Sequence, residues 1–193
     1  MNENSDIILD NIRLTNRIIA DLRLISLKQL TSDLERIELN EFLLNIFNKL
    51  KYQRENIDLT IKLLGDVDET ITTYPIALEQ VFSNLVINSI KHGFKDRSKG
   101  EIEIELKKKL DRIEIEFSDN GVGIEKGVQN KIFKEFYSSI KGGGGTGLGL
   151  AITKTIIERD FNGTIRLKAS EPNIRTTFIF DIKRFDNDEK RRN

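Results

Sequence analysis

The sequence has 193 residues, with 31 basic and 31 acidic side chains, no cysteine and one histidine, His92. This length suffices for one sizeable domain with an extra element, or for two small domains. The neutral balance gives no bulk electrostatic reason to bind nucleic acid or an anionic membrane, and the lack of cysteine excludes disulfides, thiolate zinc sites and thiol nucleophiles. A single histidine excludes a multi-histidine metal site, and a Ser–His–Asp hydrolase would have to use His92.

No apolar run approaches the roughly 18 residues needed to cross a bilayer, and the polar, acidic residues 1–11 do not resemble a secretory signal. We therefore expect a soluble, cytoplasmic piece. This expectation concerns the piece alone, and it is compatible with a membrane-anchored parent chain.

Residues 4–30 predict a long helix, because apolar side chains recur at helical spacing in two adjacent rows. The apolar stripe is wider than a two-stranded seam requires. Two interpretations remain open: a dimerisation helix that forms half of a hairpin, or a core helix packed on its own domain. Residues 31–36 are polar and predict a linker. We accordingly place domain boundaries at residues 1–31, 36–185 and 186–193, the last being a charged, flexible tail.

The rest of the chain switches between strand and helix patterns. Pro75 suits the first turn of a helix that runs to about His92. The other expected helices cover residues 42–55 and 147–159, and the expected strands cover residues 37–39, 57–63, 102–106, 113–117, 163–169 and 175–182. The predicted fold class is an α/β sandwich, a mixed sheet covered on one face by helices.

Three polar side chains share one stripe of the predicted helix over residues 76–91. Asn84, Asn88 and Lys91 are spaced at i, i+4 and i+7. Amide oxygens are hard ligands suited to Mg²⁺, and a lysine one turn further can meet a phosphate oxygen. Taken alone, the stripe is better explained as the polar edge of a helix.

A second candidate is Asp119, which follows a predicted strand and precedes Asn120-Gly121-Val122-Gly123-Ile124. A carboxylate at a strand end can accept the exocyclic amine of adenine, and glycines let a ring approach the backbone closely. The alternative is a simple turn, because Asn-Gly is a common hairpin sequence.

Two further segments lie between this motif and the end of the domain. Phe133 and Phe136 suit a short helix that anchors a mobile loop, or they are two core aromatics. Residues 142–150, Gly-Gly-Gly-Gly-Thr-Gly-Leu-Gly-Leu, run into a helix. Four successive glycines suggest a hinged lid, and the helix start offers free N–H groups to a phosphate, although a flexible linker is the alternative. The segment is neither a Walker loop nor a Rossmann turn.

The order and spacing of these four segments closely resemble the ATPase domain shared by histidine kinases, DNA gyrase, Hsp90 chaperones and MutL proteins. The resemblance covers residues 36–183, and the kinase branch fits best. Residues 79–94 resemble its N box, 118–124 its D or G1 box, 132–137 its F box and 145–150 its G2 box. The first helix resembles the second helix of the kinase dimerisation and phosphotransfer hairpin.

This resemblance implies a Bergerat-type site for ATP and Mg²⁺. Asn88, helped by Asn84, would hold the metal, with both asparagines and Lys91 as the catalytic set, and Asp119 would bind the adenine amine. The residues assigned to the nucleotide are Asn84, Asn88, Lys91, His92, Asp119, Gly121, Gly123, Ile124, Phe133, Lys141, Gly145, Thr146, Gly147, Leu148, Gly149, Leu150 and Thr177. The role of Thr177 is the least secure, because residues 173–178 depart from the usual Gly-Thr-x-Phe ending.

Asn84 distinguishes phosphate transfer from ATP hydrolysis. In the family that this sequence resembles, hydrolytic members carry a glutamate at this position, and an amide cannot act as a general base. We therefore expect a histidine to attack the γ-phosphate. His92 is followed by Gly93 rather than by an acidic residue, so the acceptor should be a histidine helix outside this chain. The expected partners are that helix, a response regulator receiver domain and a second copy bound through the first helix, with no nucleic acid. The alternatives are an anti-sigma-type serine kinase and a nucleotide-binding module without transfer activity.

Overall fold

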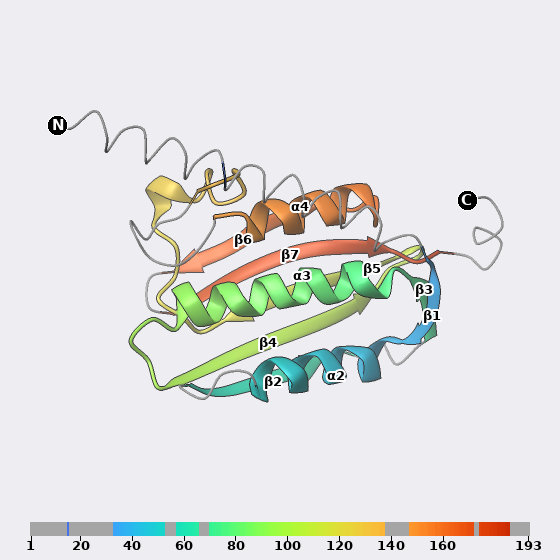
Figure 1. Cartoon of the computed structure of the whole chain (residues 1–193), viewed down its shortest axis with the longest axis horizontal. Helices are drawn as coiled ribbons and strands as arrows, with labels where there is room; N and C mark the ends of the chain where they lie inside the picture. The colour runs from blue at the N-terminus through green and yellow to red at the C-terminus, as the bar shows by residue number, and fades with distance from the viewer. Residues whose placement is uncertain are drawn as a thin grey trace.

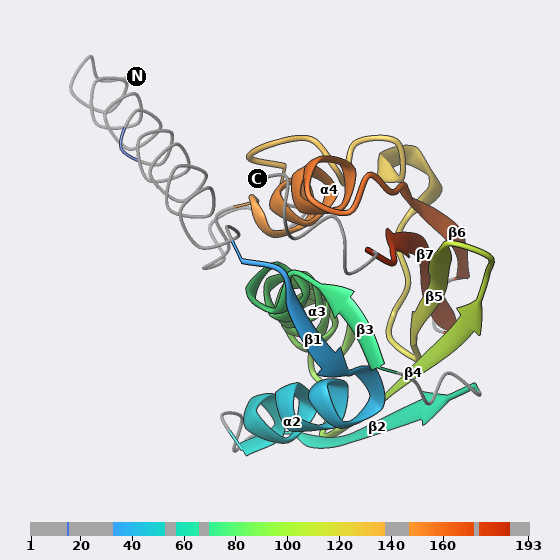
Figure 2. The same ribbon diagram turned by 90° about the vertical axis from the view of Figure 1, so that its right-hand side faces the viewer.

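The computed structural model describes residue 15 and residues 33–52, 57–65, 70–137, 147–171 and 174–185. In this part of the chain, three α-helices cover one face of a five-stranded sheet (Figures 1 and 2). The predicted α/β sandwich is thereby confirmed. Apart from Thr15, the expected first helix over residues 4–30 and the tail over residues 186–193 lie outside the described residues. No described helix combines the length and the apolar character needed to cross a lipid bilayer.

The sheet has the strand order β2-β4-β5-β7-β6, in which β2 is parallel to β4 and the other neighbours are antiparallel. Its strands are β2 (Asp58–Leu64), β4 (Lys99–Lys108), β5 (Arg112–Asp119), β6 (Ile165–Glu171) and β7 (Arg175–Lys183). β5 is thus the central strand, and Asp119 is its last residue. This position places the carboxylate at the middle of one edge of the sheet.

Only one face of the sheet is apolar. On β4, Ile102, Ile104 and Leu106 point into the core, while the alternating glutamates point outward. Lys62 on the neighbouring strand lies 2.9 Å from one of them, Glu101. Such exposed ion pairs contribute little stability, but they show that this face meets solvent while the helices bury the other.

The helical layer consists of α2 (Leu39–Tyr52), α3 (Pro75–Asn88) and α4 (Gly149–Arg159). Pro75 occupies the first turn of α3, as predicted, where its missing N–H breaks no helical bond. The predicted continuation to His92 is present but not α-helical. Residues Ser89–Gly93 form a π-helical turn, η1, in which the Phe94 N–H donates to the Ser89 carbonyl at 2.8 Å.

A second, two-stranded sheet pairs β1 (Glu35–Glu38) with β3 (Thr70–Thr73). The strand predicted over residues 37–39 covers the second half of β1, whereas its first half lies in the predicted linker over residues 31–36, and β3 was not predicted. Apolar alternation does not mark β3, because Ile71 is its one aliphatic residue. Thr72 also bridges to Phe185, so β3 holds both the start and the end of the domain. The β-branched composition of Thr70–Thr73 was the available indication of a strand.

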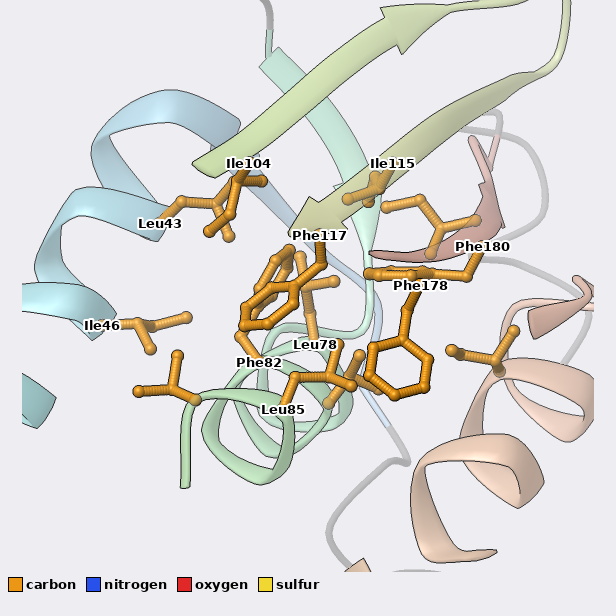
Figure 3. Packing of buried hydrophobic residues seen from close by; sticks show 14 of the residues in the cluster. Leu43, Ile46, Leu78, Phe82, Leu85, Ile104, Ile115, Phe117, Phe178 and Phe180 are labelled. Atoms are coloured by element: carbon orange, nitrogen blue, oxygen red, sulfur yellow. The ribbon is translucent and has the colours of Figure 1, made fainter. Parts of the chain in front are cut away.

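Phe82 of α3 lies at the centre of the core and joins the helices to the sheet (Figure 3). Its side chain is fully buried, and its ring meets Phe47 of α2 edge-on at 5.6 Å and Phe180 of β7 at 5.9 Å between centroids. The same helix presents Leu78 and Leu85 to the sheet. Burial of this apolar stripe fixes α3, and therefore the polar residues at its C-terminal end, against the central strands.

We predict that Phe82→Ala lowers the free energy of unfolding by about 3–5 kcal/mol, because it removes a buried ring and leaves a cavity between three elements. Urea denaturation measures the change. Leu44→Ala on α2 is the control, since Leu44 is 50% exposed and its truncation should alter stability by about 0.5 kcal/mol or less. Equal losses in the two variants would contradict the central role of Phe82.

Candidate functional site

The predicted site residues gather where the end of α3, the π turn η1, the end of β5 and the start of α4 meet. The π turn adds one residue to the helical repeat, a feature often found at functional positions. It follows Asn88 directly and carries Ser89, Lys91 and His92. Asn88 and Ser89 are successive residues of the helix and point about 100° apart, so they contact two different elements, the start of α4 and the end of β5.

Asp119 is the buried acid of the site, with 5% of its surface exposed. Its Oδ2 accepts a hydrogen bond from the Ser89 hydroxyl at 2.9 Å, and its Oδ1 accepts one from the Gly121 N–H at 3.0 Å. These two bonds fix the orientation of the carboxylate. They also leave lone pairs on both oxygens for a further donor.

Two glycines allow the backbone to close around this carboxylate. A Cβ on Gly121 would lie 2.6 Å from Asp119 Oδ1 and 2.6 Å from the Gly93 Cα, distances that no side chain can occupy. The Val122 N–H donates to the Gly93 carbonyl at 2.9 Å and ties the two segments together. Gly121 was predicted as a site residue, whereas the packing role of Gly93 was missed.

Burial raises the pKa of the Asp119 carboxyl above its usual range. The hydrogen bonds from Ser89 and Gly121 and the positive charge of Arg97 oppose the shift without cancelling it. The Arg97 guanidinium is anchored at 2.6 Å by the carbonyl of Asn120. A buried carboxyl with a raised pKa at the end of a central strand is typical of a functional site.

Hydroxyl groups lie near the acid on both faces of the sheet. Thr177 of β7, a predicted site residue, is buried and its hydroxyl lies 2.9 Å from that of Ser118 on β5. Ser118 is paired with Thr177 across the strands, immediately beside Asp119. Because successive strand residues point to opposite faces, Ser118 and Thr177 lie on the other face of the sheet from Asp119. Thr176, which is buried and paired with Asp119, is the hydroxyl residue on the face of the acid.

Asn84 is engaged in a network between α3 and α4. Its Oδ1 accepts from Gln80 Nε2 at 2.9 Å, and its Nδ2 donates to the Gly149 carbonyl at 3.2 Å and to the Thr153 hydroxyl at 3.3 Å. Thr153 also donates to the same carbonyl at 2.9 Å. The amide oxygen predicted as a metal ligand thus accepts one hydrogen bond within the protein, and Asn84 connects the two helices.

Asn88 differs from Asn84 in having an unsatisfied amide. Its Nδ2 is buried without a hydrogen-bond partner, and a Cβ on Gly149 would lie 3.5 Å from both amide atoms. The side chain therefore faces the start of α4. Because the two ends of an amide exchange by a simple flip, either its oxygen or its nitrogen can be presented to a ligand.

His92 provides the second unsatisfied polar atom of the site, because its Nδ1 is buried without a hydrogen-bond partner. Burial, and then the nearby charge of Lys91, lower the pKa of the imidazole. The ring is therefore neutral at pH 7, and its free nitrogen can accept or donate one hydrogen bond. Lys91 itself is exposed.

The segment after Asp119 closes one side of the site. Gly123 has a positive φ of 80°, and the Ile124 N–H donates to the Ser170 hydroxyl of β6 at 2.6 Å. Phe133 packs edge-on against Phe178 of β7, with 6.1 Å between ring centroids. These contacts hold the predicted residues Gly123, Ile124 and Phe133 at the sheet edge, whereas the contact with Ser170 was missed.

Gly147 marks the start of the segment that leads into α4. Its φ is +67°, and a Cβ there would lie 2.6 Å from the backbone carbon of Phe136. Leu148 is buried, and no side chain caps the N-terminus of α4, which begins at Gly149-Leu150. The N–H groups of this first turn are therefore available to an anion. Three other predicted residues, Lys141, Gly145 and Thr146, lie outside the described residues.

The site consequently has two chemically distinct ends joined by the π turn. At one end a buried carboxylate and close-packed glycine backbones suit a flat ring that carries an amine. At the other end the unsatisfied Asn88 amide and the start of α4 suit a phosphate or its metal ion. The described residues contain no group of three or more His, Cys, Asp or Glu side chains able to enclose a metal. A cation here would share its ligands with a bound anion and water.

Comparison with known proteins gives a family match. Residues 73–185, more than half of the chain, match the family described as histidine kinase-, DNA gyrase B- and HSP90-like ATPase. The sensor kinase WalK of Staphylococcus aureus is 34% identical over 171 residues, which cover 84% of this chain and 28% of WalK. The heme sensor HssS of Staphylococcus saprophyticus is 34% identical over 150 residues, which cover 77% of this chain and 31% of HssS. The chain thus spans less than a third of the length of these relatives.

Solved structures give the same assignment. The catalytic domain of the histidine kinase ThkA superposes with a TM-score of 0.67 at 26% identity, covering 82% of this chain and 99% of that domain. ThkA in complex with the response regulator protein TrrA matches with a TM-score of 0.66 at 20% identity, over 93% of this chain and 50% of that chain. The chain therefore belongs to the histidine kinase-, DNA gyrase B- and HSP90-like ATPase family, as an ATP-binding catalytic domain of the sensor histidine kinase type.

Proposed function

We propose that this chain binds Mg-ATP and transfers the γ-phosphate to a histidine on a dimerisation helix. The observation that carries the proposal is the pair of successive residues Asn88 and Ser89. Asn88 faces the start of α4 with an unsatisfied amide, and Ser89 donates to the buried Asp119. One turn of helix thus connects a purine-binding end to a phosphate-binding end.

Adenine recognition is assigned to Asp119. Its carboxylate accepts the exocyclic amine, while Gly121 and Gly123 leave space for the ring to lie against the backbone. Ile124 and Phe133 provide apolar surface beside it, and Thr176, which is paired with Asp119, lies on the same face of the sheet. A C6 carbonyl in place of the amine would be repelled by the ionised acid.

Phosphate and metal binding are assigned to the opposite end. Asn88 would supply its amide oxygen as one ligand of Mg²⁺, since its Nδ2 has no partner that fixes the orientation of the amide. Mg²⁺ keeps several waters and binds through few protein groups when phosphates supply the rest. When bound, Mg²⁺ neutralises charge that develops on the transferred phosphate. The N–H groups at the start of α4 and Lys91 would bind phosphate oxygens, and His92 offers its free Nδ1 to the ribose or phosphate side.

Transfer, rather than hydrolysis, is favoured by Asn84. Its amide cannot remove a proton from water, and both of its ends are engaged in the α3–α4 network. The nucleophile is therefore assigned to a histidine imidazole that attacks in line. His92 is the single histidine of this chain and lies within the nucleotide site, so the acceptor belongs to another segment or chain.

The proposed setting is a cytoplasmic homodimer, joined through the helix predicted over residues 4–30, that passes the phosphoryl group to a receiver aspartate. Two observations on other proteins support this setting. The relatives WalK and HssS are named as sensor proteins, and ThkA has been seen in complex with the response regulator TrrA.

The proposed reaction predicts a specific labelling pattern. The chain alone, incubated with Mg and γ-labelled ATP, should retain no label, whereas a separately supplied dimerisation hairpin of a sensor kinase should become labelled. The label should be lost in acid, because phosphohistidine is acid-labile and phosphoserine is not. Acid-stable label would instead support a serine kinase. Tight nucleotide binding with no transfer to any supplied hairpin would support a binding module.

Asn88 and Asn84 should differ in their effect on metal dependence. We predict that Asn88→Ala weakens binding of an ATP analogue about tenfold or more with Mg²⁺ present, equivalent to ~1.4 kcal/mol, and has little effect without Mg²⁺. Asn84→Ala, the matched control, should weaken binding equally in both conditions, because it loosens α4 rather than removing a ligand. Calorimetric titration distinguishes the two patterns. Identical patterns in the two variants would exclude the assignment of Asn88 to the metal.

We predict that Asp119→Asn weakens nucleotide binding but increases the stability of the fold. The variant should lose at least about tenfold in ADP affinity, since the acceptor of the amine is replaced by a neutral amide. It should also be more stable than the wild type at pH 7. The folded protein raises the pKa of Asp119, so ionisation of this buried acid opposes folding at neutral pH.

The raised pKa of Asp119 also determines how the stability difference between Asp119→Asn and the wild type changes with pH. Because the folded state holds this proton more tightly than the unfolded state, the stability advantage of Asp119→Asn should grow as the pH rises through the raised pKa, and disappear in acid. Thermal unfolding at several pH values measures it. Asp111→Asn, at an exposed position of the β4–β5 turn, is the control. A variant that is destabilised at pH 7 and still binds ADP normally would contradict both assignments.

A further inference from the structure

Ser89 has one hydroxyl proton and two acceptors within reach. Its Oγ lies 2.9 Å from Asp119 Oδ2 and 3.2 Å from the carbonyl oxygen of Leu85, and the residue is 3% exposed. A hydroxyl donates one full hydrogen bond at a time while its lone pairs accept others. The Ser89 hydroxyl therefore donates either to Asp119 Oδ2 or to the Leu85 carbonyl. Rotation of the hydroxyl exchanges these two arrangements without a water molecule.

The choice between these arrangements depends on the charge of Asp119. When the acid is ionised, Ser89 donates to Oδ2, and this charge-assisted bond is the stronger of its two options. When the acid is protonated, the carboxyl proton can point to Ser89 Oγ, while the hydroxyl turns to the Leu85 carbonyl. Both charge states of a buried acid thus keep their hydrogen bonds, an arrangement that a purely apolar neighbour would not provide.

The other oxygen of the acid is less available to a ligand. Asp119 Oδ1 accepts from the Gly121 N–H, and the Gly93 and Gly121 backbones pack against it so closely that a Cβ on either would lie 3.0 Å or 2.6 Å away. Oδ2, the oxygen that Ser89 contacts, therefore has the remaining capacity to accept from a purine. Ser89 and the purine amine act on the same atom.

We propose that Ser89 is a positioning and specificity-determining residue, which holds Asp119 Oδ2 as an acceptor so that the site selects a purine with a C6 amine over one with a C6 carbonyl. This proposal rests on the proposed nucleotide-binding function and names the residue that sets its base preference. Binding of adenine to the protonated acid then releases one proton to the solvent, because the amine requires an ionised Oδ2.

Among the described residues, few charged side chains influence the ionisation of Asp119. In the described part of the chain, Arg97 is the charged side chain that acts on Asp119, and it favours the ionised form from the loop after η1. Lys91 and His92 lie on the same π turn as Ser89. The strand neighbours Ser118 and Thr177 are neutral and bind each other. Removing the Ser89 hydroxyl therefore changes one hydrogen bond to Asp119 and no charge.

Ser89→Ala should shift the pH dependence of ADP binding. Loss of one donor to the carboxylate makes the acid easier to protonate, so the midpoint at which affinity falls in acid should move up by about one pH unit. Below this midpoint the protonated acid has lost its serine acceptor and can donate to a ligand instead. The preference for ADP over IDP, which carries a C6 carbonyl, should therefore fall severalfold in the variant at acidic pH.

The experiment is calorimetric titration of the whole chain with ADP and with IDP from pH 5 to pH 8, on the wild type, Ser89→Ala and Ser89→Thr. Ser89→Thr retains the hydroxyl and should restore the wild-type midpoint and base preference. A purely structural role for Ser89 would weaken ADP and IDP alike and leave the midpoint unchanged. Superimposable pH profiles and ADP-to-IDP ratios in wild type and Ser89→Ala would overturn the proposal.

A second measurement separates this proposal from the proposed function. Titration of the Asp119 carboxyl carbon by NMR, without nucleotide, reports the Ser89 contact directly in wild type and Ser89→Ala. A higher titration midpoint in the variant supports the proposal, and an equal midpoint overturns it, whether or not ATP is bound. Failure of the wild type to bind ADP at any pH would instead refute the proposed function.

Discussion

The site depends on keeping one carboxylate buried at the end of the central strand. Water can no longer solvate Asp119, so the fold substitutes two directed donors, the Ser89 hydroxyl and the Gly121 N–H. These donors do not restore the usual proton affinity of the acid, which stays raised by burial. Burial of the ionised acid therefore opposes folding, and under the proposed function an amine donated by a purine would offset part of this unfavourable free energy.

That constraint explains the geometry around the acid. Gly93 and Gly121 lack side chains because their backbones meet beside the carboxylate. At the end of α3, Ser89 contacts the acid while Asn88 faces α4. α3 must be held firmly for this to work, and the fully buried Phe82 fixes it between α2 and the sheet. The same helix, α3, therefore carries Phe82 in the core and Asn88 in the site at its C-terminal end.

Much of this arrangement was predictable from sequence, because it follows from periodicity and motif order. Apolar alternation marked the strands of the main sheet, and the D-box residues placed Asp119 at a strand end. β3 was missed because its pairing, rather than an apolar alternation, defines it. The Ser89 contact was missed because Ser89 belongs to the apolar stripe that faces the sheet, and the sequence does not show which strand end lies opposite it. The engagement of Asn84 by Gln80 depends on rotamers that spacing alone does not fix.

The central claim is that Asn88 and Asp119 hold opposite ends of one nucleotide. The most direct measurement is an amide NMR spectrum of the chain with ADP, in which Mg²⁺ is replaced by paramagnetic Mn²⁺. The account predicts that signals of Asn88 and Gly149 are broadened most strongly, and that Gly121 shifts on ADP binding with weaker broadening, since the metal lies at the phosphate end. Perturbations confined to the outer, charged face of the sheet, with Gly121 and Gly149 unchanged, would contradict it.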